Sequence, residues 1–121
     1  MNKIKTIVSI CLFPILLISC AKTLDQQTEV KDIRKKETII LSKKPSQDNI
    51  HSIKINISGT IEGESKISLI LNNEEYKTNK LNGNCSFNWG GDWYADTAKI
   101  IYQPINAQNG NITIRYEFKD I

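Results

Sequence analysis

The stretch Ile53-Lys54-Ile55-Asn56-Ile57-Ser58 alternates strictly between isoleucine and a polar residue. Successive side chains of a β-strand point to opposite faces of a sheet, so the three isoleucines share one face and the three polar side chains share the other. β-branched residues such as isoleucine also pack well on a pleated surface. The stretch therefore predicts a strand with one buried face and one face in water.

The same alternation recurs along the chain, between short groups of turn-forming residues. The strands predicted in this way are 38–42, 53–58, 67–71, 75–81, 84–89, 94–102 and 111–118. Turns are predicted at Asn72-Asn73, Asn82-Gly83 and Asn109-Gly110, because asparagine and glycine tolerate a positive φ. Seven short strands without any predicted helix indicate an all-β domain, a single antiparallel β-sandwich over residues 37–121, with an open barrel as the alternative.

The residues before the first predicted strand are mostly polar or charged. Leu24, Val30 and Ile33 are isolated apolar positions, too few to bury one face of a helix or strand. Residues 20–36 are therefore predicted to be a flexible tether that joins the start of the chain to the β domain.

The first residues have the composition of an export signal. Lys3 and Lys5 precede an apolar run from residue 7 to residue 18, and the small residue Ser19 comes directly before Cys20. The run is interrupted by Pro14 and is shorter than the ~20 residues that a membrane-spanning helix needs. Residues 1–19 are therefore predicted to be a cleaved leader.

The end of this leader, Leu17-Ile18-Ser19-Cys20, resembles the lipobox of bacterial lipoproteins. The resemblance implies that the thiol of Cys20 is diacylated, that the chain is cut before Cys20, and that the new amino group is acylated. It also implies a lipid-anchored protein of the bacterial cell envelope. Ala21 stands where some lipoproteins carry the aspartate of inner-membrane retention, so the outer membrane is favoured.

Loss of the leader changes the composition. The chain has 16 basic and 13 acidic residues, and removal of Lys3 and Lys5 leaves 14 basic residues. A nearly neutral chain gives no case for a nucleic-acid partner. Cys11 leaves with the leader and Cys20 becomes a thioether, so Cys85 is predicted to have no disulfide partner within the chain.

Two residues with reactive side chains, Cys85 and His51, are predicted to have structural positions and no chemical role. Cys85 shares its strand face with Phe87 and Trp89, which predicts a buried, inert thiol. His51 is the single histidine, and we expect it to be exposed at the end of a strand. No metal site or cofactor is expected, because one histidine cannot complete a common zinc set.

Aromatic and acidic residues concentrate in Trp89-Gly90-Gly91-Asp92-Trp93-Tyr94-Ala95-Asp96. One hypothesis places Trp89 and Tyr94 in the core and makes the glycine pair a bulge. A second hypothesis exposes Trp93 beside Asp92 and Asp96, as a platform for a sugar ring or a partner side chain. A third would bind calcium through the two aspartates, although their spacing matches no ordered calcium loop.

Residues 59–118 are loosely similar to short bacterial lipoproteins of uncharacterised function that share a glycine-glycine-aspartate-tryptophan-tyrosine stretch, here Gly90 to Tyr94. This likeness implies no known activity.

The sequence thus predicts a non-enzymatic binding or assembly protein, anchored to the membrane through Cys20, with a protein, glycan or peptidoglycan partner. One alternative is a carbohydrate-active or hydrolase-like enzyme centred on Asp92, Trp93 and Asp96. The other is an inhibitor or protective lipoprotein, in which the glycine pair forms the tip of an inserting loop.

Overall fold

A computed structural model describes residues 24–121 of the chain. Cys20, the predicted leader and the first residues of the predicted tether lie outside the described residues, so lipidation of Cys20 stays a prediction. Within residues 24–121, no helix has the length and the apolar character needed to cross a membrane.

The described residues form six strands in one antiparallel sheet. The strands are β1 (Gln26–Glu29), β2 (Glu37–Ser42), β3 (Ile50–Leu71), β4 (Glu74–Asp92), β5 (Thr97–Pro104) and β6 (Asn109–Asp120). Their order is β1-β6-β3-β5-β2, and β4 pairs with β3 off this path. The predicted all-β, antiparallel class is confirmed.

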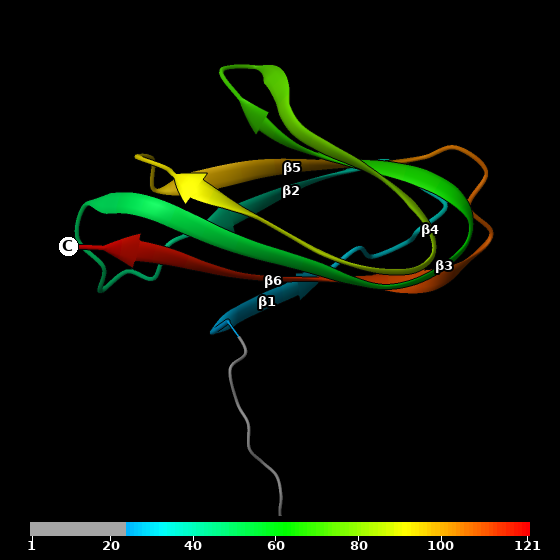
Figure 1. The fold of residues 1–121 in the computed structure, drawn as a ribbon, viewed down its shortest axis with the longest axis horizontal. Coiled ribbons are helices and arrows are strands. Elements are labelled where there is room, and N and C mark those ends of the chain that lie inside the picture. Colours follow the sequence, from blue (N-terminus) through cyan, green and yellow to red (C-terminus); the bar gives the residue numbers. More distant parts are fainter. Residues whose placement is uncertain (1–23) are drawn as a thin grey trace, which may run out of the picture.

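The long strand β3 is the spine of the sheet. Its first half pairs with β6 and its second half with β5, while β4 pairs with both halves. The sheet curls into a half-barrel, so that the half containing β1 and β6 faces the half containing β2 and β5 (Figure 1). The predicted sandwich of seven strands is therefore replaced by one curled sheet of six strands.

Two pairs of predicted strands are single strands in the structure. Segments 53–58 and 67–71 both belong to β3, and segments 75–81 and 84–89 both belong to β4. The chain bends between them without reversing, so the predicted hairpin turn at Asn82-Gly83 is wrong. Gly83, with φ 68°, lies inside β4 where the pairing with β3 shifts register. The predicted turn at Asn72-Asn73 is confirmed, with φ angles of 54° and 65°.

The core lies between the two halves of the sheet and is rich in isoleucine. The largest fully buried apolar side chains are Leu41, Ile55, Ile57, Ile67, Leu81, Ile100, Tyr102, Ile112, Ile114 and Phe118. The predicted inward row of Ile53, Ile55 and Ile57 is confirmed. Leu71 at the end of β3 is 40% exposed, because the β3–β4 hairpin projects beyond the rest of the sheet (Figure 1).

The folded domain begins earlier than predicted. β1 pairs with β6, and the side chains of Val30 and Ile33 are buried in the core. The hydroxyl of Tyr102 donates a 2.6 Å hydrogen bond to the carbonyl oxygen of Ile33. The predicted flexible tether up to residue 36 is therefore wrong from Gln26 onward, because a segment with few apolar residues is held by pairing with an existing strand.

Candidate functional site

Trp93 does not form the platform of the second hypothesis. Only 6% of its surface is exposed, and its indole N–H donates a 3.0 Å hydrogen bond to the carbonyl oxygen of Thr97. Tyr94, expected in the core by the first hypothesis, is instead 76% exposed. β4 ends at Asp92, so the strand alternation that assigned these faces no longer applies. Asp92 and Asp96 are both exposed, and Asp96 lies 3.7 Å from the ammonium group of Lys43.

Trp89 is buried, as the core hypothesis predicted. Its indole N–H donates a 2.8 Å hydrogen bond to Asn79 Oδ1, which joins the two arms of the bent strand β4. Gly90 and Gly91 pair with Lys54 and Ile53 of β3. The glycine pair is therefore part of a strand, and the predicted inserting loop tip at this position is wrong.

Two residues with reactive side chains, Cys85 and His51, were predicted to be buried and exposed, respectively. Cys85 lies on the core side of β4, as predicted, but it is half-buried rather than fully buried. Its Sγ lies 3.5 Å from the carbonyl oxygen of Gly83. His51 is exposed at the start of β3. Residues 24–121 contain no group of three or more His, Cys, Asp or Glu side chains that could hold a metal ion.

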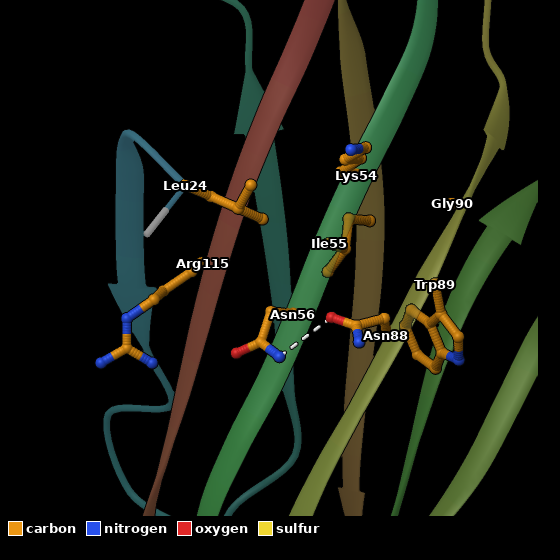
Figure 2. A pocket seen from close by; sticks show the side chains of 8 residues that line it. All are labelled: Leu24, Lys54, Ile55, Asn56, Asn88, Trp89, Gly90 and Arg115. Carbon is orange, nitrogen blue, oxygen red and sulfur yellow. Dashed lines mark hydrogen bonds between the residues drawn. The ribbon is translucent and has the colours of Figure 1, made fainter. Parts of the chain in front are cut away.

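The structure reveals a different hollow, on the outer face of the half formed by β1, β6, β3 and β4. We call it the outer pocket. Its volume is about 630 Å³, and it is lined by Leu24, Lys54, Ile55, Asn56, Asn88, Trp89, Gly90 and Arg115. Figure 2 shows Leu24 and Arg115 on one side of this pocket and Asn88 and Gly90 on the other.

Strand register brings the polar residues of the outer pocket together. Asn56 of β3 lies opposite Asn88 of β4 and, on its other side, opposite Arg115 of β6. Lys54 lies opposite Gly90, whose missing side chain leaves room beside it. Because residues two apart share a face, Lys54 and Asn56 both point outward from β3.

Hydrogen bonds hold the side chains of the outer pocket in place. Asn56 Nδ2 donates a 3.0 Å hydrogen bond to Asn88 Oδ1 (Figure 2). Arg115 donates through Nη1 to the hydroxyl of Ser58 at 3.0 Å. Among the described residues, no hydrogen bond engages Asn56 Oδ1 or Asn88 Nδ2. One amide acceptor and one amide donor therefore remain for a ligand.

The charge of the outer pocket is positive. Lys54 and Arg115 line it, and none of the described residues that line it is acidic. Within residues 24–121, neither cation lies within ion-pair distance of a carboxylate. Glu117 lies opposite Lys54 in the register but lines a neighbouring hollow. The outer pocket thus presents two amides and two cations that form no ion pair within residues 24–121.

The chain enters the domain at the rim of this pocket. Leu24 lines the pocket, and the next residue, Asp25, forms an ion pair with Lys44. The side-chain hydrogen bond from Lys44 to Asp25 raises the pKa of this lysine. Gln26 Nε2 also donates a 3.0 Å hydrogen bond to the carbonyl oxygen of Ser42. These contacts fix the entry point relative to the sheet.

The outer pocket could be anticipated only in part. Alternation within the predicted strands 53–58, 84–89 and 111–118 places Lys54, Asn56, Asn88 and Arg115 on the faces turned away from the core. It did not predict that these side chains are neighbours, because strand pairing order cannot be read from alternation within each strand.

Comparisons with protein-family models, with curated proteins and with solved structures find no match to this chain.

Proposed function

We propose that the protein is a lipid-anchored, non-enzymatic binding protein of the bacterial envelope, and that its outer pocket captures an anionic ligand with hydroxyl groups. One observation carries this proposal: Lys54 and Arg115 line the same pocket as the amides of Asn56 and Asn88, and none of the described residues that line it carries a carboxylate. The lipobox-like residues Leu17 to Cys20 support the anchor.

The chemistry of each lining group supports this ligand class. The planar guanidinium of Arg115 matches a phosphate or carboxylate group through paired hydrogen bonds, and Lys54 adds a second positive charge. The amides of Asn56 and Asn88 can donate to and accept from hydroxyl groups. The described residues of the lining include no carboxylate, imidazole or thiol, the side chains that acid–base and nucleophilic catalysis use most. Binding alone therefore accounts for the composition of the pocket.

Binding can be tested by NMR with three soluble probes: glycerol 3-phosphate, glucuronate and glucose. The protein is the chain from residue 20 with Cys20→Ser, which contains all six strands. We expect the two anionic probes to shift the side-chain amide signals of Asn56 and Asn88, and glucose to shift them less. Asn88→Ala should weaken this response, whereas Asn84→Ala, outside the pocket on the same strand, should preserve it. Failure of every probe to shift these signals would reject the proposed ligand class.

Lipidation of Cys20 can be tested separately. Cells grown with a labelled fatty acid should incorporate label into the wild-type protein and not into Cys20→Ala. An unlabelled wild-type protein would show that the anchor is absent.

A second candidate function is inhibition of another protein, and the projecting β3–β4 hairpin favours it (Figure 1). Near its tip, Leu71 and Tyr76 are 40% and 51% exposed. A photo-crosslinker at residue 76 should then capture one defined enzyme, and Tyr76→Ala should relieve the inhibition of that enzyme.

The enzyme alternative centred on Asp92 and Asp96 loses its main support, because Trp93 is buried.

A further inference from the structure

The folded domain starts close to the predicted lipid anchor. Leu24, which lines the outer pocket, is only four residues after Cys20. A chain spans at most ~3.3–3.6 Å per residue, so the Cα atoms of Cys20 and Leu24 are at most about 14 Å apart. A lipid on Cys20 would therefore keep the outer pocket near the membrane surface.

The entry point of the chain and the outer pocket belong to the same rigid half of the sheet. β1 pairs with β6 from Gln26 opposite Tyr116, and Arg115 of β6 lines the pocket. The Asp25–Lys44 ion pair and the Gln26–Ser42 hydrogen bond hold the residues that follow Leu24. The outer pocket therefore keeps a fixed position relative to β1 and to Leu24, the described residue nearest to Cys20 in the sequence.

The charge distribution favours a discrete anionic group over a broad charged surface. Lys54 and Arg115 line the pocket, whereas the outer face around it also carries Glu29 and Glu117. A surface of mixed charge attracts an anionic bilayer weakly, because neighbouring opposite charges offset each other and salt screens what remains beyond a Debye length. Two cations in one hollow can still hold a single phosphate group.

We infer that the outer pocket seats the headgroup of an anionic phospholipid from the same membrane that holds the anchor. The phosphate lies between Lys54 and Arg115, and the headgroup hydroxyls contact the amides of Asn56 and Asn88. Leu24 lies at the side where the acyl chains begin. The inference rests on the proposed function and names the source of its anionic, hydroxylated ligand.

Vesicle sedimentation tests this inference with the Cys20→Ser protein, which carries no lipid of its own. The vesicles are phosphatidylcholine, with or without phosphatidylglycerol. We expect sedimentation only with phosphatidylglycerol. Each basic residue near an anionic surface contributes ~1 kcal/mol, so Lys54→Gln and Arg115→Gln should each weaken binding about fivefold or more. The matched control, Lys99→Gln on the outer face of the other half, should bind like the parent protein.

The outcomes separate this inference from the proposed function. Equal binding to both kinds of vesicle, or an equal loss in Lys99→Gln, would overturn the phospholipid inference. A pocket that responds to glycerol 3-phosphate or glucuronate in solution without binding vesicles would also overturn it, and would leave the proposed function standing. Absence of both responses would reject both.

Discussion

Three glycines line the sharp bend of the sheet where neighbouring strands approach each other closely. Gly59, Gly63 and Gly110 have φ angles of 148°, 95° and 129°, which side chains of L-residues rarely adopt. A Cβ at Gly59 would overlap the carbonyl oxygen of Asn111, and a Cβ at Gly110 would overlap that of Thr60. The curled shape of the sheet therefore depends on the absence of side chains at these positions.

Gly59→Ala should lower the free energy of unfolding by roughly 2–6 kcal/mol, because backbone strain and steric overlap add. Gly83→Ala is the matched control, since Gly83 also has a positive φ but a Cβ there would contact nothing within 4 Å. We expect a cost of only about 1–2 kcal/mol for the control. Urea denaturation measures both, and equal costs would show that overlap at the bend is unimportant.

The phenol of Tyr102 joins the segment before β2 to the core. Burial raises the pKa of Tyr102, so the hydroxyl stays protonated and donates to Ile33. Tyr102→Phe should cost about 1–3 kcal/mol, because the carbonyl of Ile33 loses its partner. Tyr94→Phe, at a 76% exposed residue, should change stability by less than about 0.5 kcal/mol. Indistinguishable denaturation midpoints for the two variants would contradict this role of the phenol.

At the scale of elements, local patterns predicted strands and faces better than connections. Alternation identified the inward row of Ile53, Ile55 and Ile57, because side-chain direction depends only on the strand itself. An Asn-Gly pair signals a positive φ, and both a hairpin turn and a bend within a strand satisfy that signal. Asn72-Asn73 forms the turn between β3 and β4, whereas Asn82-Gly83 forms a bend within β4, and only contacts between strands distinguish the two. Contacts between strands also assemble the outer pocket.

Residues 24–36 were predicted to belong to the tether, because the contacts that hold them to the domain come from distant strands. Their contribution to stability can be measured. A chain that begins at Glu37 lacks β1 and the buried side chains of Val30 and Ile33. Burial of each such side chain contributes ~1.5–3 kcal/mol, so we expect a loss of roughly 3–6 kcal/mol and a much lower thermal midpoint. A chain that begins at Leu24 should keep the parent midpoint. Equal midpoints for both truncated chains would restore the interpretation of this segment as a tether.

The loop between β2 and β3 is fastened to the end of β6 by Asp120. The backbone N–H of Asp48 donates a 2.8 Å hydrogen bond to Oδ2 of Asp120, and this bond lowers the pKa of the carboxyl group below 3.8. Protons therefore bind the unfolded chain first as the pH falls. The contribution to stability is complete above pH 3.8 and disappears as the pH passes below the folded-state pKa.

Asp120→Asn should therefore lower the thermal midpoint at neutral pH and have a progressively smaller effect in strong acid. Thermal unfolding of the parent and variant across this pH range provides the measurement. A difference between the two that stays constant from neutral to strongly acidic pH would contradict the role of the ionised carboxylate.

At the scale of the whole molecule, the proposed lipid anchor on Cys20 would have two separable effects, because Cys20 is only four residues before Leu24. It would hold the outer pocket near the bilayer mechanically, and it would raise the local concentration of headgroups around Lys54 and Arg115. A longer spacer removes the mechanical constraint. The domain then stays at the bilayer only if the outer pocket itself binds headgroups. An insertion of about twenty Gly and Ser residues after Lys22 would add a mean end-to-end distance of about 25 Å.

Combining this insertion with Arg115→Gln distinguishes tethering from recognition. A dye at Tyr94→Cys, in a Cys85→Ala background, reports energy transfer to a labelled lipid in vesicles that contain phosphatidylglycerol. With the native spacer, Arg115→Gln should change the transfer little, because the anchor alone keeps the domain close. With the long spacer, the same substitution should release the domain and lower the transfer clearly, whereas Lys99→Gln should not. If Arg115→Gln has no effect at either spacer length, the pocket plays no part in holding the domain at the membrane and the anchor alone determines its position.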